Sequence, residues 1–224
     1  MDDFTSLFSE FDVLGAFWTN IQLTFFAAIV SLVVGTVLAV MRISPVPSLR
    51  WAGSTYVTLI RNTPLTVIIV FCVLGLWGQL GITLSSDFQR NFFWLSVLGL
   101  AVYHAAFVCE ALRSGVNTVP VGQAEAARAI GLDFASSARL VILPQAFRGA
   151  VAPLGNVLIA LTKNSTVAAA GSVAETSGLL RTMIENRPDL ILAIFFIFAF
   201  GFVLIVVPIG LATTSLSRRL AVAR

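Results

Sequence analysis

The chain has 224 residues, of which 58% are hydrophobic and only 11% are charged. Soluble domains carry about a quarter charged residues, so this composition excludes a water-facing globular domain and makes the lipid bilayer the expected solvent. The formal charge of +3 comes almost entirely from arginines, and the longest basic run is the pair Arg218–Arg219, so we expect no nucleic-acid partner.

Five hydrophobic stretches are each long enough, at 1.5 Å per residue, to cross a hydrocarbon core of about 30 Å. Polar residues interrupt two of them: Arg61-Asn62-Thr63-Pro64 lies within the second, and Lys163-Asn164 within the fourth. We therefore expect an all-α integral membrane protein, with residues 1–224 forming one transmembrane domain. The expected helices cover about 13–41, 54–77, 92–112, 150–170 and 190–211.

Arginines are distributed unequally between the expected loops. They gather after the first helix, between the third and fourth helices, and after the fifth helix, and five spans place all three regions on one side. The opposite side receives the N-terminus with Asp2 and Asp3, and the loops 87–90 and 171–189. The positive-inside rule then predicts an N-terminus outside the cell and a cytoplasmic C-terminus. The arginines expected in the cytoplasm are Arg42, Arg50, Arg113, Arg128, Arg139, Arg148, Arg218, Arg219 and Arg224.

The loop from 113 to 148 is too polar to span the bilayer, yet it is patterned as short helices. Residues 121–130 are rich in Ala, Gln and Glu, which helices tolerate well. Gly131 stands where this helix can end in a left-handed cap, and Asp133 can cap the next helix. Pro144 predicts a later break. The pattern indicates a helix, a Gly turn and a second helix on the cytoplasmic face, suited to docking into a groove of a soluble partner.

In this loop Glu125-Ala126-Ala127 is followed after three residues by Gly131, and after nine more by Val141-Ile142-Leu143-Pro144. This pattern resembles the EAA loop of ABC-importer permeases, in which the last segment is I-x-L-P. Val141 stands where Ile is usual. Three further segments, 61–65 (RNTPL), 110–115 (EALRSG) and 161–165 (LTKNS), resemble motifs of the polar-amino-acid permeases. Over most of its length the chain is similar to that family, and most of all to the glutamate-uptake permeases of actinobacteria.

The resemblance implies a type I ABC importer fold with five transmembrane helices in a bacterial cell membrane. An extracytoplasmic binding protein delivers glutamate or a related polar amino acid to a pathway formed by two permease subunits. We expect the second to be a homologous chain, so that the pair is a heterodimer, although the residues alone are equally compatible with a homodimer. A dimer of ATPase subunits moves both permeases through their coupling loops. The coupling residues implied here are Gln123, Glu125, Ala126, Ala127, Gly131, Leu132 and Asp133.

The chain has no nucleotide site of its own. A phosphate-binding loop of the form G-x-x-x-x-G-K-[ST] needs a lysine after glycine, whereas the single lysine, Lys163, follows Thr162. We therefore expect a transport subunit and not an enzyme, with no cofactor or metal bound by this chain and with ATP and Mg at the partner ATPase.

Three ionisable residues lie within expected spans, where each costs about 2.5–3.5 kcal/mol on insertion scales. Arg61 and Lys163 either extend toward the membrane surface or face a wet cavity and attract the substrate carboxylate. Glu110 either pairs with Arg113 or Arg61 or receives an α-ammonium group. Polar neighbours add hydrogen-bond donors beside the two cations, although such side chains also bond their own helix. The candidate substrate path comprises Arg61, Asn62, Thr63, Glu110, Lys163, Asn164 and Ser165.

Two rival functions are weighed against the importer. A homo-oligomeric channel or secondary transporter that acts without an ATPase needs no cytoplasmic docking loop, so the 113–148 segment argues against it. An intramembrane enzyme needs a close catalytic pair, but His104 and Glu110 on one helix point about 120° apart. Cys72 and Cys109 are expected as packing residues. The residues alone are compatible with any amino acid as substrate, because each carries a carboxylate.

Overall fold

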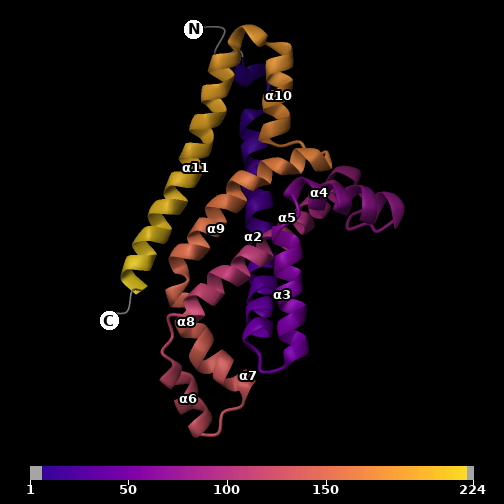
Figure 1. Ribbon diagram of the computed structural model, residues 1–224. Helices are drawn as coiled ribbons and strands as arrows, with labels where there is room; N and C mark the ends of the chain where they lie inside the picture. Colours follow the sequence, from indigo (N-terminus) through magenta and orange to yellow (C-terminus); the bar gives the residue numbers. More distant parts are fainter. Residues whose placement is uncertain (1–6, 221–224) are drawn as a thin grey trace. The chain divides into compact units, whose positions relative to one another are not determined.

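The computed structural model describes residues 7–220, and all regular secondary structure in that range is helical (Figure 1). Asp2, Asp3 and Arg224, which contribute to the predicted orientation, lie outside the described residues. The chain forms two compact units. The first unit contains the segments up to Ala28, Pro64–Ala101 and Ala160–Pro208, and the second contains Ile29–Thr63, Val102–Ile159 and the segment from Ile209. Four helices contribute a part to each unit.

Three helices of the described chain are long and apolar enough to cross a membrane without a break: α2 (Val13–Ile43), α5 (Phe88–Val116) and α11 (Ile191–Leu220) with the short 3₁₀ turn η4 (Pro188–Leu190) before it. α5 and α11 both extend beyond the stretches expected at 92–112 and 190–211. Hydropathy marks only the part of a helix that lipid surrounds, whereas the backbone stays helical into the polar region.

The stretch expected as a single helix at 54–77 is instead two helices bent by 104°. α3 (Pro47–Arg61) ends before Pro64, and the chain resumes as α4 (Leu65–Val70) and the π-helix η1 (Phe71–Gln79). Pro64 has no N–H to donate and disfavours helical geometry in the residue before it, so the helix stops. The Asn62 amide and the Thr63 hydroxyl donate to the carbonyls of Thr58 and Leu59, at 2.7 and 2.9 Å, and satisfy the last turn of α3.

The fourth stretch, expected as one helix at 150–170, is the first half of a second bent pair. α9 (Val151–Asn164) continues as the 3₁₀ helix η3 (Ser165–Gly171), and α10 (Thr176–Asn186) follows at 64°. α10 lies in a segment expected as a loop. It begins there because the Glu175 carboxylate accepts the backbone N–H groups of Ser177 and Gly178 at 2.9–3.0 Å.

A buried polar network in the first unit ties this second bend to α2. The Asn20 amide donates to Ser165 Oγ at 2.8 Å and to Glu175 Oε2 at 3.1 Å, while its carbonyl oxygen accepts the Thr176 N–H at 3.0 Å. All four residues are at most 1% exposed. One side chain of α2 therefore satisfies the start of η3 and the start of α10 together.

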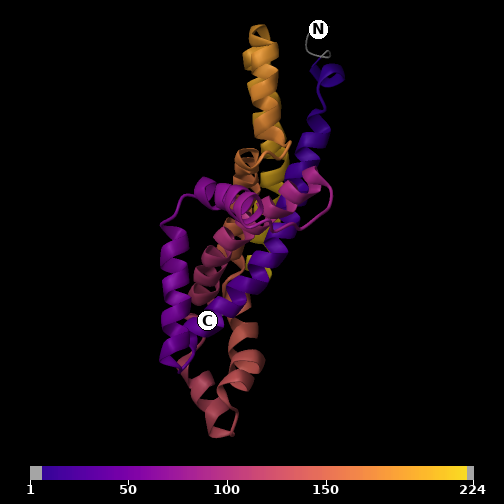
Figure 2. The same ribbon diagram turned by 90° about the vertical axis from the view of Figure 1, so that its right-hand side faces the viewer.

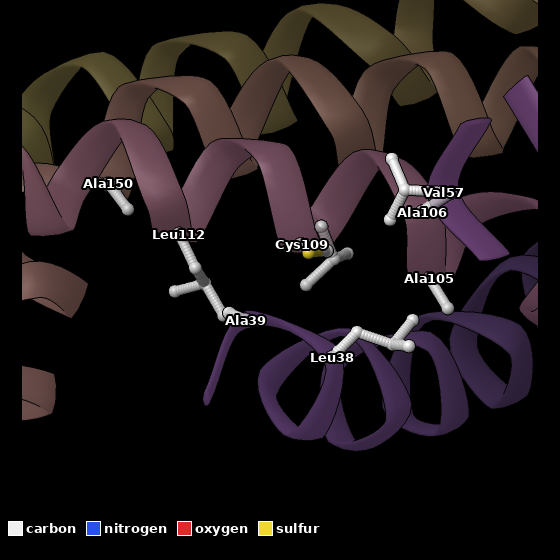
Figure 3. Packing of buried hydrophobic residues seen from close by; sticks show 9 residues of the cluster. Leu38, Ala39, Val57, Ala105, Ala106, Cys109, Leu112 and Ala150 are labelled. Atoms are coloured by element: carbon white, nitrogen blue, oxygen red, sulfur yellow. The ribbon is translucent and has the colours of Figure 1, made fainter. Parts of the chain in front are cut away.

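Apolar residues fill the core of each unit. In the first, Leu7 and Val13 pack with Met183 of α10 and with Ile194 and Phe198 of α11. In the second, the core lies where α2, α3 and α5 meet, and Cys109 is one of its fully buried members, as expected for a packing residue (Figure 3). Its residues are Leu38, Ala39, Val57, Ala105, Ala106, Val108, Cys109, Leu112 and Ala150.

The polar segment after α5 folds as a helical hairpin within the second unit. α6 (Val121–Ala129) and α7 (Phe134–Ser137) lie side by side, joined by a tight turn (Figures 1 and 2). α7 continues through the π-helix η2 (Ala138–Ile142) into α8 (Leu143–Gly149). The break predicted at Pro144 is therefore wrong: the chain stays helical through this proline, which lies just after the π-helix η2, and such a local change of helix type accommodates the missing N–H.

The predicted glycine turn between α6 and α7 is confirmed. Gly131 has φ +88°, its N–H bonds the Arg128 carbonyl at 3.0 Å, and the Leu132 N–H bonds the Ala127 carbonyl at 3.1 Å. These two bonds form a Schellman cap, which satisfies carbonyls that the end of α6 leaves free. Asp133 then accepts the Ser136 N–H at 2.8 Å and starts α7, also as predicted.

Replacing Asn20 by Leu should lower the stability of the folded protein in detergent. The change leaves Glu175, the Ser165 hydroxyl and the Thr176 N–H without a shared partner in a buried site, at a cost of about 1–3 kcal/mol in unfolding free energy. Thr24→Val on the same helix is the matched control, because the Thr24 hydroxyl is buried without a hydrogen-bond partner in the described structure. Equal unfolding midpoints of the two variants would contradict the assigned role of Asn20.

Candidate functional site

A cluster of charged side chains surrounds Glu110 on α5, in the second unit. Arg42, at the end of α2, donates from Nη1 to Glu110 Oε1. Arg61, the last residue of α3, brings Nη1 to 3.9 Å from the same oxygen, and Arg113 Nε lies 3.6 Å from Oε2. Three positive charges therefore face one negative charge, and the cluster has an excess of positive charge.

A pocket of about 390 Å³ opens beside this cluster and is lined by Arg42, Val57, Thr58, Arg61, Asn62, Phe107 and Glu110. The Arg42 side chain is 15% exposed and is committed to Glu110, whereas the Arg61 side chain is 47% exposed. The Arg61 guanidinium carbon lies 5.6 Å from the centre of the Phe107 ring, a cation–π geometry that holds the group in place. Arg61 is therefore the cation of this pocket that a small anion can reach.

The expected pairing of Glu110 with Arg61 and Arg113 is found, but the contact with Arg42 is new. The sequence assigned Arg42 only to membrane orientation, and no local spacing connects it to Glu110, 68 positions away. Asn62 lines the pocket, yet its amide donates to its own helix, as does the Thr63 hydroxyl. Of the polar neighbours of Arg61, the structure therefore brings Asn62 to the pocket and not Thr63.

The other candidate residues, Lys163, Asn164 and Ser165, lie in the first unit at the junction of α9 and η3. Lys163 is exposed, and its ammonium group forms no ion pair within residues 7–220. Asn164 is half-buried. Ser165 is 0% exposed, and its hydroxyl donates to the Thr162 carbonyl at 2.8 Å and accepts from Asn20. The expectation that Ser165 faces a wet path disagrees with this burial, because its hydroxyl already serves the network that anchors η3.

The candidate coupling residues occupy α6 and the turn after it. Gln123, Glu125 and Ala126 are exposed, whereas Ala127 is only 3% exposed and anchors α6 to its own protein. Gly131 and Asp133 are exposed in the turn, and Leu132 is half-buried.

Large apolar side chains stand out from this same polar segment. Val121, Ile130 and Leu140 are 72%, 78% and 64% exposed. Exposed apolar side chains of this size are the kind of surface that a protein partner can cover.

The Asp133 carboxylate gives the turn a fixed charge. The Ser136 side chain and backbone N–H donate to this carboxylate and lower the pKa of Asp133 below its ordinary value. A depressed pKa means that the charged cap supports the fold above the ordinary Asp pKa and that this support is lost as the pH falls through the lower, folded-state value. The cap is therefore fully ionised at neutral pH. Within residues 7–220, no group of three metal-binding side chains comes together.

Comparisons with known proteins agree with this architecture. The family described as "Binding-protein-dependent transport system inner membrane component" matches residues 31–222. The glutamate transport system permease protein GluC of Corynebacterium efficiens is 50% identical over 94% of this chain and 94% of that protein, and GluC of Corynebacterium glutamicum is 48% identical over the same shares. A crystal structure of an amino acid ABC transporter with histidines superposes with a TM-score of 0.78 at 27% identity, covering 98% of this chain and 96% of that one.

These likenesses confirm the predicted all-α permease fold and the interpretation of the chain as a transport subunit and not an enzyme. They also argue against the rival function, a homo-oligomeric channel or secondary transporter that acts without an ATPase, because the related proteins are permeases of ABC importers. The chain belongs to the family of inner membrane components of binding-protein-dependent transport systems.

Proposed function

We propose that this chain is the membrane-spanning subunit of an ATP-driven importer for glutamate or a closely related polar amino acid. The relatives named for glutamate transport cover 94% of the chain and support the substrate. The observation that carries the proposal is the pocket at Arg61, where three arginines face one glutamate. Such a pocket attracts an anion and rejects a cation.

The charges of the pocket suit an acidic amino acid. Glu110 offsets one arginine, so the remaining positive charge favours a substrate with two carboxylates and one ammonium group. Arg61 can hold a carboxylate through two parallel hydrogen bonds, and its stacking on Phe107 fixes the guanidinium plane for this contact. Glu110 is within reach of the α-ammonium group of a molecule bound there. The field of these charges is weakly screened in a cavity with low-dielectric walls.

Lys163 and Asn164 are proposed as a second polar station on the substrate path. Lys163 carries an exposed ammonium group without an ion-pair partner in the described chain, on a helix that has no other charged residue. A charged side chain within a membrane-spanning helix is costly in free energy, and a hydrated path for an anionic substrate would explain its presence. Thr63 lies next to the path at Arg61. Ser165 lies next to the path at Lys163, where its hydroxyl belongs to the buried network with Asn20.

The partners follow from the exposed hairpin and from the family. The hairpin docks on an ATPase dimer through exposed residues of α6 and its C-terminal end, namely Val121, Gln123, Glu125, Ala126 and Ile130. The ATPase dimer binds ATP and Mg. An extracytoplasmic binding protein supplies the amino acid. A second permease completes the pathway, because one set of helices encloses only half of a transport path. This second permease is proposed to be a homologous chain, which makes the pair a heterodimer.

The chain is proposed to lie in the plasma membrane with its N-terminus outside and its C-terminus in the cytoplasm. The arginines of the 113–148 segment and those after α11 support this orientation through the positive-inside rule. The coupling hairpin then faces the cytoplasm, where the ATPase must be.

Cysteine labelling in intact cells tests the orientation. A membrane-impermeant maleimide should label Ser177→Cys on α10 from outside and should label Ala135→Cys on α7 only after permeabilisation, since both positions are exposed. Unchanged Cys72 and Cys109 serve as the background, because both thiols are buried. Labelling of Ala135→Cys in sealed cells would refute the orientation.

Replacing Gly131 by Val should uncouple transport from ATP hydrolysis. A Cβ at Gly131 meets no atom within 4 Å, so the cost comes from the φ of +88° and amounts to roughly 1–2 kcal/mol for an L residue. Asn tolerates this region better, and Gly131→Asn should retain more uptake than Gly131→Val. Gly178→Val is the matched control, with open space and no positive φ. Uptake and ATPase binding are measured at equal membrane abundance, and wild-type values in Gly131→Val would rule out a role for the turn.

Changes at Arg61 and Lys163 test the substrate path. Arg61→Lys keeps the charge but loses the paired hydrogen bonds, so glutamate uptake by the reconstituted complex should fall roughly tenfold. Lys163→Met should also impair uptake by removing a charge. Arg50→Lys is the control on the same helix as Arg61, outside the pocket.

Uptake of glutamine decides between a substrate role and a structural role. With a binding protein that delivers both amino acids, loss of a substrate cation should reduce glutamate uptake more than glutamine uptake. Equal reduction of both would mean that the residue only supports the fold, and the path assignment would fail while the importer assignment stands.

A further inference from the structure

A second pocket, of about 410 Å³, lies in the first unit and takes no part in the proposed path. Three segments build it: α2 around residues 19–26, the first turns of α5 at residues 89–94, and the turn 172–174 between η3 and α10. Ser172 in that turn has φ 61°, a left-handed conformation that is uncommon outside glycine. The backbone is thus shaped to bring the turn against the two helices.

Three polar side chains of this pocket have hydrogen-bonding groups that no described part of the protein uses. Gln22, Gln89 and Arg90 line it, and within residues 7–220 none of their side chains forms a hydrogen bond or an ion pair. The nearby Asp87 carboxylate accepts the backbone N–H of Arg90 at 2.8 Å and caps α5, so this bond involves the main chain of Arg90 and not its guanidinium. One cation and two amides therefore converge on a space that no protein group fills.

An aromatic wall faces these polar groups. The Trp94 ring lies 4.9 Å from Phe26 and 5.3 Å from Phe93, centre to centre, with the rings packed edge to face. This mutual packing holds the indole in place. An indole face is the best of the aromatic side chains for binding an ammonium group.

We infer that this pocket is a second binding site for the transported acidic amino acid, and the inference rests on the proposed function. Arg90 binds a carboxylate, the two glutamines bind the other carboxylate, and the aromatic wall receives the ammonium group. In the proposed orientation the loops 87–90 and 171–189 face outside, so the site receives the amino acid from the binding protein.

The size of the pocket favours a free molecule as the occupant. Small-molecule sites measure about 300–1,000 Å³, and this pocket falls within that range. A single acidic side chain from a docking protein would leave the aromatic wall and at least one amide without a partner. The amino acid offers a group to each part of the lining, and a protein loop at this surface becomes an alternative that the experiment tests.

Protection from thiol labelling tests the inference in the complete transporter, with its ATPase and second permease, in lipid nanodiscs. Ala174 lines the pocket and is exposed, so a maleimide should modify Ala174→Cys. L-Glutamate should slow this reaction severalfold and L-glutamine should slow it less. The rate for Ser177→Cys, which is exposed outside the pocket, should not change.

The source of the protection is identified by a second substitution in the Ala174→Cys background. Arg90→Gln should abolish protection by glutamate, whereas Arg181→Gln should leave it intact, because Arg181 is an exposed arginine that pairs with Glu185 away from the pocket. Full protection in Arg90→Gln would overturn the inference.

Uptake by the same nanodisc preparation, transferred into vesicles, separates the inference from the proposed function. If glutamate at about 10 mM, enough to fill a site with a Kd near 1 mM, gives no protection while uptake of glutamate proceeds, the second site is refuted and the importer stands. If only the binding protein protects Ala174→Cys, the surface docks that protein and the inference is equally refuted. If no acidic amino acid is taken up, the proposed function fails, and the site inferred for that substrate fails with it.

Discussion

Inside a bilayer, a helix that bends must find partners within the protein for the N–H and C=O groups that the bend releases. Within residues 7–220 two pairs of helices are bent, and at each bend side chains of the protein form hydrogen bonds with the released groups. At the first bend, Asn62 and Thr63 return hydrogen bonds to the end of α3. At the second, the buried Glu175 caps α10, and Asn20 of α2 holds Glu175 and Ser165 together. Arg61 is the last residue before the first bend, whereas Lys163 lies two residues before the 3₁₀ helix η3 that leads to the second bend.

The charges near the first bend explain why the pocket at Arg61 is suited to bind an anionic substrate. A single carboxylate, Glu110, organises three arginines that approach from α2, α3 and α5. Without that carboxylate the three like charges would repel one another in a poorly screened setting. With it, Arg42 is occupied, while the better-exposed Arg61 keeps donors for a ligand. A pocket that retains positive charge and a guanidinium held against Phe107 is suited to bind a carboxylate. The binding is weak, because Glu110 already balances part of the positive charge.

The hairpin of α6 and α7 follows a different principle. Its geometry depends on short-range chemistry: a glycine that accepts a left-handed φ, and an aspartate that starts the next helix. Ala127 faces inward, so the small side chain allows α6 to lie close to its own protein, while the neighbouring residues of the triplet face outward. One side of α6 therefore packs against its own protein, and the other side is exposed and accessible to a partner. That arrangement suits a rigid element that transmits movement between a membrane domain and a partner.

Composition and local spacing were enough to predict the membrane environment, the helical class, the left-handed turn at Gly131, the cap at Asp133 and the family. Each of these depends on composition or on residues within one or two turns of each other, and such signals are visible in spacing. The bend angles, the contact of Arg42 with Glu110, the burial of Ser165 and the pocket at Arg90 arise only when the helices pack together. The hydrogen bonds that hold this packing join residues up to 156 positions apart, as for Asn20 and Thr176. No local pattern encodes which distant side chain will satisfy a buried polar group, because that choice is made only when the helices pack.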